Sequence, residues 1–152
     1  MKLFLAFALS VFLFSCQDTK RPSYAKKEVS SKITTQQHPG KKLMIANCYV
    51  CHSPSASHEN RIAPPMVAVK KHYLDANTSK EQFTASLQNW IENPTKENAK
   101  MYGAVKRFGL MPKQAFPKET ITQIAAYMFD NDIEKPEWFD AHEKEEHTKK
   151  RN

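Results

Sequence analysis

Two cysteines and a histidine stand close together in this 152-residue chain, as Cys48, Cys51 and His52 in the stretch NCYVCHSP. Three kinds of chemistry use these residue types at the spacing CxxCH. Thiolates and imidazole together bind zinc, and two cysteines separated by two residues can cycle between dithiol and disulfide. Alternatively, two thiols can add to the vinyl groups of a porphyrin while the imidazole coordinates its iron. The rest of the chain must decide among these three.

Zinc binding and thiol redox chemistry each need features that the rest of the sequence does not offer clearly. A structural zinc site requires a fourth strong ligand beyond the three residues of the motif. A thioredoxin-like pair is expected within a βαβ unit, whereas no stretch of this chain reads convincingly as an alternating β-strand. We keep a zinc or thiol redox module as the less favoured alternative.

The chain begins with a secretory pattern. Its first fourteen residues, MKLFLAFALSVFLF, combine one positive charge with an apolar run. A helix of about 12 apolar residues spans roughly 18 Å, well short of the roughly 30 Å hydrocarbon core of a membrane. The run ends in LFSC, which resembles the lipobox of bacterial lipoproteins. This resemblance implies cleavage after residue 15, acylation of Cys16 and a lipid-anchored position in the bacterial cell envelope, facing the periplasm or the exterior. A plain signal peptide with an incidental cysteine is the alternative.

Composition divides the chain into four segments. Residues 17–38 are polar, rich in Ser, Thr and Lys and without apolar periodicity, which is typical of a flexible tether. The formal charge of +7 is spread among acidic residues, so we expect no nucleic-acid-binding arm. The predicted organisation is a signal peptide (1–15), a lipidated cysteine with the tether (16–38), a folded domain (39–133) and a polar C-terminal extension (134–152).

The C-terminal extension combines aromatic and charged residues. Its tail, AHEKEEHTKKRN, mixes acids and bases, and we expect it to be solvated and mobile. Trp138 and Phe139 precede that tail. We expect these two aromatic side chains to fold back onto the domain, and a patch that binds a partner protein is the alternative.

Helical signals predict that the folded domain is all-α. Pro39 suits the first position of a helix. A capping-box pattern begins at Thr78 or Ser79 and precedes a second helix, which ends before Pro94. A further helix opens at Pro117. The second and third of these helices carry apolar stripes at helical spacing, namely Phe83, Leu87, Trp90 and Ile91, then Ile121, Ile124, Ala125 and Met128.

The region from residue 39 to about residue 129 resembles class I monohaem cytochromes c, which are small all-α domains wrapped around one covalent haem c. The resemblance implies that Cys48 and Cys51 hold the porphyrin and that His52 binds its iron. The stretch RIAPPM resembles the loop in which a proline carbonyl accepts the ring hydrogen of that histidine. Pro64, twelve residues beyond His52, matches this proline. Such a hydrogen bond fixes the tautomer, so that the other ring nitrogen faces the metal.

The same resemblance covers the helix crossing and the second axial ligand. Gly40 and Tyr127 match positions at which the first and last helices of these cytochromes cross closely. The stretch GLMPKQAFPKETITQIAAYM resembles their distal segment and implies that Met111, sixteen residues before Tyr127, is the second iron ligand. Met101 is the alternative. The other methionines and histidines that could compete are expected in the core or at the surface: Met66, Met128, His58, His72 and His142.

The resemblance implies electron transfer, with no enzymatic activity. His52 and Met111 would occupy both axial positions, which leaves no open position for a substrate, and a thioether ligand raises the reduction potential. We therefore expect a membrane-anchored one-electron carrier between redox partner proteins of the respiratory chain or periplasm. A haem-bearing subunit or sensor domain of a larger membrane redox complex is the alternative within the same chemistry.

Overall fold

The computed structural model describes residues 38–149 of the chain. The predictions of a signal peptide, of lipidation at Cys16 and of a tether concern residues that lie outside this range, apart from residue 38 itself. Everything below refers to the described part.

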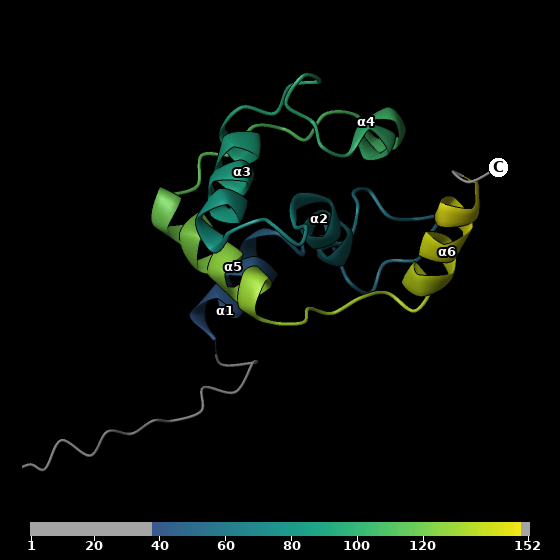
Figure 1. Ribbon diagram of the computed structural model, residues 1–152, viewed down its shortest axis with the longest axis horizontal. Helices are drawn as coiled ribbons and strands as arrows, with labels where there is room; N and C mark the ends of the chain where they lie inside the picture. Colours follow the sequence, from purple (N-terminus) through teal and green to yellow (C-terminus); the bar gives the residue numbers. More distant parts are fainter. Residues whose placement is uncertain (1–37, 150–152) are drawn as a thin grey trace, which may run out of the picture. The chain divides into compact units, whose positions relative to one another are not determined.

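Six helices make up the described chain, and it contains no β-strand. The prediction of an all-α domain is confirmed for these residues. None of the described helices combines the length and the apolar character that a membrane span requires. The helices, labelled in Figure 1, are α1 (Pro39–Asn47), α2 (Met66–Tyr73), α3 (Lys80–Glu92), α4 (Tyr102–Phe108), α5 (Lys118–Asp130) and α6 (Phe139–Lys149).

Helices α1 and α5 cross at Gly40, and their contact is the most extensive between any two helices of the domain. A Cβ atom added at Gly40 would lie 2.0 Å from the carbonyl oxygen of Gln123 and 2.7 Å from the Cβ atom of Tyr127. Only a glycine therefore lets the two backbones approach this closely. Tyr127 is fully buried at the crossing, so the expected close contact of Gly40 with Tyr127 is present.

Helix α3 also packs against α5, and the two helices share the hydrophobic core. A capping box starts it, because the Ser79 side chain accepts a hydrogen bond from the Gln82 amide while the Gln82 side chain accepts one from the Ser79 amide. Phe83 and Leu87 are buried on α3. The predicted stripe of α5 is buried as a whole, with Ile121, Ile124, Ala125 and Met128.

Three helices were not predicted. Helices α2 and α4 are short, at eight and seven residues, and carry no capping side chain that would announce their start. Helix α6 corrects the expectation of a solvated, mobile tail. Its residues after Phe139 are largely exposed, but they are helical and tied down by an ion pair of 2.5 Å between Glu143 and Lys71 of α2. The polar composition correctly predicted that these residues are exposed to solvent, but it did not predict the ion pair between Glu143 and Lys71.

The aromatic residues at the start of α6 fold back onto the domain, as predicted. Phe139 is 5% exposed and packs with Val67 and Ala68 of α2. The indole N–H of Trp138 donates a hydrogen bond of 2.8 Å to the carbonyl oxygen of Ala56. Residues beyond α5 therefore contribute to the packing of the domain.

An ion pair between a buried lysine and an exposed glutamate joins α1 to the chain that follows α5. The Lys41 ammonium, on a residue that is 7% exposed, contacts the Glu134 carboxylate. The same carboxylate accepts a hydrogen bond of 2.8 Å from the hydroxyl of Tyr49. Burial opposes ionisation of Glu134, but the hydrogen bonds from Lys41 and Tyr49 outweigh it and lower the pKa of the carboxyl. The hydrogen bond to Glu134 raises the pKa of Lys41 against the opposing effect of burial.

Replacing Gly40 with alanine is expected to destabilise the domain by about 1–3 kcal/mol, because the added methyl group forces α1 away from α5. Gly103 of α4 is the matched control, since a Cβ atom there meets nothing within 4 Å. Gly103→Ala should leave stability unchanged or raise it by up to about 1 kcal/mol. Urea unfolding followed by circular dichroism measures both variants, and equal midpoints for the two would contradict the tight crossing.

Replacing Glu134 with glutamine is expected to cost about 0.5–1 kcal/mol at neutral pH, because Lys41 then keeps its charge without a counter-ion, while the exposed side of the Glu134 carboxylate lets solvent screen the pair. The folded-state pKa of Glu134 is lowered, so its stabilisation is complete above the unfolded pKa of about 4.3 and disappears as pH falls through the folded pKa. The stability difference between wild type and Glu134→Gln should thus vanish in acid. Urea titrations at a series of pH values measure it, with the exposed Glu145→Gln as control. A difference that stays constant down to the acid limit would refute the role of the Glu134 charge.

Candidate functional site

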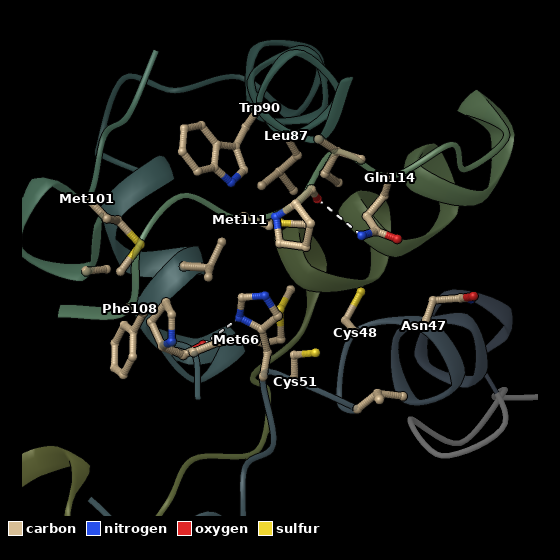
Figure 2. Close-up of a pocket in the computed structure, with 18 of the residues that line it drawn as sticks. Asn47, Cys48, Cys51, Met66, Leu87, Trp90, Met101, Phe108, Met111 and Gln114 are labelled. Atoms are coloured by element: carbon tan, nitrogen blue, oxygen red, sulfur yellow. Dashed lines mark hydrogen bonds between the residues drawn. The ribbon is translucent and has the colours of Figure 1, made fainter. Parts of the chain in front are cut away.

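A cavity of about 520 Å³ lies inside the domain, bordered by parts of the first five helices and the loops between them. Its size falls within the roughly 300–1,000 Å³ range of cavities that bind small molecules and cofactors. Most of its wall is apolar, and Figure 2 shows Leu87, Trp90 and Phe108 around it. The side chains of the core therefore surround a space large enough for a sizeable apolar ligand.

Cys48 and Cys51 reach this cavity from the turn that ends α1. The Cys48 amide donates to the Met44 carbonyl over 2.8 Å, which caps the helix. The amides of Cys51 and His52 then both donate to the Cys48 carbonyl, over 3.2 Å and 2.8 Å. This tight turn brings all three residues of the CxxCH motif to the cavity wall, and Figure 2 shows the two sulfur atoms on the same side of it.

Both cysteines are free thiols, and their surroundings differ. Cys51 is exposed, whereas burial raises the pKa of the Cys48 thiol to about 11. Thiols that serve as redox nucleophiles have lowered pKa values, since the thiolate is the reactive form. Cys48 lacks that activation in this environment.

The ring of His52 is held by a hydrogen bond from its Nδ1 to the carbonyl oxygen of Pro64, 2.6 Å away. A carbonyl can only accept, so Nδ1 carries the hydrogen and Nε2 keeps its lone pair. Burial lowers the pKa of His52, partly opposed by the Pro64 hydrogen bond, and the neutral form is the one that binds metals. The expected contact between His52 and Pro64 is therefore present, and it leaves one ring nitrogen available as a ligand.

Met111 lines the same cavity from a separate segment of the chain, between α4 and α5. Gly109 ends α4 with a φ of 81°, a conformation that favours glycine and turns the chain toward Met111. Gln114 then fixes the segment, because its amide donates to the Ile91 carbonyl over 3.3 Å and its side chain to the Pro112 carbonyl over 3.1 Å. The structure thus gathers Cys48, Cys51, His52, Pro64 and Met111 around one cavity.

The alternative methionine also reaches the cavity. Met101, which precedes α4, lines it together with Met66 and Met128. The last two are buried members of the core, as expected. Geometry alone leaves both Met101 and Met111 as possible thioether ligands. His58, His72 and His142 do not line the cavity.

The sequence did not predict that several other residues line the cavity. Trp90 was predicted on an apolar helix stripe, but that stripe borders the cavity as well as the core. Phe108 and Gln114 lie in α4 and in the loop after it, where no pattern marked them. Periodicity identifies an apolar face and does not say what that face contacts.

Among residues 38–149 no group of three or more His, Cys, Asp and Glu side chains is gathered closely enough to hold a metal ion by itself. Comparisons of the chain with protein-family models, with curated proteins and with solved structures gave no match. The functional argument therefore depends on the chemistry of the residues around the cavity.

Proposed function

We propose that this chain is a monohaem c-type cytochrome that carries single electrons between redox partner proteins. The observation that carries the proposal is the arrangement of Cys48, Cys51 and His52 along the wall of a 520 Å³ cavity that Met111 also lines. Two thiols for covalent attachment, an imidazole with a free nitrogen and a thioether are the donors that haem c uses. The apolar wall suits the flat, apolar body of a porphyrin.

Different residues of the cavity would bind different parts of the cofactor. Cys48 and Cys51 would bind the porphyrin covalently, and His52 and Met111 would bind the iron. When bound, haem c supplies reversible one-electron exchange between the ferric and ferrous states. Pro64 keeps the His52 ring in one tautomer and makes its free nitrogen a better donor. The apolar lining excludes water, which disfavours the extra positive charge of the oxidised state and raises the reduction potential.

Access to the cavity from solvent supports electron transfer over catalysis. Three apolar side chains line the cavity and are also exposed, with Val50 at 75%, Ile62 at 66% and Leu110 at 42%. An exposed apolar rim at the edge of a cofactor suits brief contact with a redox partner, for which small interfaces suffice. Two protein ligands on the iron would leave no position for a substrate. The formal charge of +7 would speed encounters with acidic partners.

The cellular setting that we propose comes from the amino terminus. A lipid on Cys16 would anchor the chain to a bacterial membrane, and the polar residues up to 38 would let the domain reach its partners. This part of the proposal depends on the sequence pattern LFSC and on the preceding apolar run.

The alternatives are less well supported. A permanent subunit or sensor would need an attachment surface, and the aromatic pair expected to provide it is packed against the domain instead, with Phe139 buried and Trp138 hydrogen-bonded to Ala56. A zinc or thiol module has no use for a large apolar cavity beside its cysteines. The zinc or thiol module also gives no role to the methionine segment fixed at the same cavity.

Replacing both Cys48 and Cys51 with alanine should abolish covalent haem in a host that can attach it. The apo chain is expected to lose most of its folded structure, because the cavity then remains without its ligand. Mass spectrometry and circular dichroism test this. Cys16→Ser is the cysteine control and should keep the haem mass while releasing the protein from the membrane fraction. A bare wild-type polypeptide, or a double variant as stable as wild type, would refute the proposed function.

Replacing Met111 with alanine should convert the iron from low-spin to high-spin, lower the reduction potential and open a position for cyanide or imidazole. Met101→Ala is the matched control, because Met101 lines the same cavity and should leave the absorption spectrum unchanged. Absorption spectra and redox titration distinguish the two. The reverse pattern would assign the ligand to Met101, and an unchanged spectrum in both variants would exclude Met111 and Met101 as ligands.

A further inference from the structure

The loop of residues 53–64, between His52 and α2, carries Pro64 and has little structure of its own. It contains turns at residues 54–55 and 58–60, but no backbone–backbone hydrogen bond of good geometry joins it to other segments of the described chain. Its internal polar contacts are local: the Ser53 hydroxyl contacts the amide and hydroxyl of Ser55, the Asn60 amide donates to the Ser57 hydroxyl, and the Arg61 guanidinium donates to the His58 carbonyl. The position of the Pro64 carbonyl therefore depends on side chains from other segments that bind the loop.

One such side chain is Trp138, from the C-terminal extension. Its indole N–H donates to the carbonyl oxygen of Ala56 over 2.8 Å, across 82 residues of sequence. The guanidinium carbon of Arg61 lies 4.5 Å from the centre of the indole ring, which is a cation–π contact. Trp138 thus holds the loop at two points, near its start and three residues before Pro64.

Arg61 also contacts the part of the cavity wall that precedes Met111. Its guanidinium carbon also lies 5.6 Å from the centre of the Phe108 ring. Phe108 lines the cavity and precedes Met111 by three residues. Arg107, beside Phe108, donates a further hydrogen bond of 2.8 Å to the His58 carbonyl. The loop that carries Pro64 and the segment that carries Met111 are therefore joined through Arg61.

The extension that supplies Trp138 is anchored independently of the cavity. Phe139 is buried against α2, and Glu143 of α6 pairs with Lys71 of α2. Neither Trp138 nor these anchoring residues line the cavity. The indole is thus fixed to α2 on one side and to the loop on the other.

We propose that Trp138 is a positioning residue for the two iron ligands: through Ala56 and Arg61 it holds the loop of Pro64, and through Arg61 and Phe108 it holds the segment of Met111. The effect on iron rests on the proposed function, whereas the restraint of the loop does not. Losing Trp138 should loosen the Pro64–His52 hydrogen bond and the Met111 segment together. The expected consequences are a lower reduction potential and easier displacement of Met111 by added ligands.

Trypsin provides a direct readout of the loop, because cleavage between Arg61 and Ile62 requires the Arg61 side chain to leave its aromatic contacts. Limited digestion of the full-length protein, with fragments identified by mass spectrometry, should show cleavage at this bond about tenfold faster in Trp138→Leu than in wild type, the factor for a loss of about 1.4 kcal/mol. Trp138→Phe keeps an aromatic face and loses the N–H, so it should be intermediate. Glu145→Gln is the control, since Glu145 is exposed on α6 and does not take part in the ion pair that anchors the extension.

The same variants, with haem attached, are then titrated with imidazole and measured for reduction potential. Trp138→Leu should bind imidazole more tightly and have a lower potential, while Glu145→Gln should match wild type. An unchanged rate of cleavage at Arg61 in Trp138→Leu would refute the proposal that Trp138 restrains the loop. Faster cleavage with unchanged potential and imidazole affinity would reduce Trp138 to a structural residue. If wild type carries no haem, the proposed function and the effect on iron fail together, and cleavage at Arg61 still decides the restraint.

Discussion

The interior of this domain contains an apolar space that its side chains do not fill. Protein cores are normally packed about as densely as organic crystals, so a cavity of about 520 Å³ in a chain of this size is a large departure. Its walls come from segments spread over the described chain, from the end of α1 to α5. A ligand that fills the space would contact most of these elements at once, and its binding would add to the stability of the fold. The proposed haem therefore belongs to the energetics of the structure as much as to its function.

Contacts outside the cavity fix the position of the residues that line it. Gly40 allows α1 to lie directly on α5, which fixes the end of α1 where Cys48 caps the helix. Tyr49, between the two cysteines in sequence, is tied through Glu134 to Lys41 of the same helix. The CxxCH turn is thus positioned by a helix crossing and by the ion pair of Lys41 with Glu134. Neither contact involves a residue that would touch the cofactor.

The C-terminal extension has a structural role that its composition conceals. It reads as a polar tail with two aromatic residues, yet Trp138 and Phe139 bind different parts of the domain. Phe139 secures the extension to α2, and Trp138 restrains a loop that no backbone–backbone hydrogen bond of good geometry joins to other segments of the described chain. The extension does not line the cavity, yet it is connected to the segments that carry Pro64 and Met111, because Arg61 contacts both Trp138 and Phe108.

Features that depend on residues close together in the chain could be predicted from the sequence alone. The CxxCH spacing, Pro39 at the start of α1, the capping box of Ser79 and the apolar stripe of α5 each depend on residues within a few positions of one another. Few contacts between distant segments could be predicted. A family resemblance supplied Gly40 against Tyr127, His52 with Pro64, and Met111 near the CxxCH motif. The aromatic character of Trp138 and Phe139 indicated that they fold back onto the domain. Tertiary structure alone decided that Trp90 borders a cavity, that Met101 reaches it as well as Met111, and that the polar tail forms α6. Periodicity records which side of a helix is apolar, but the partner of that side is set by how the whole chain packs.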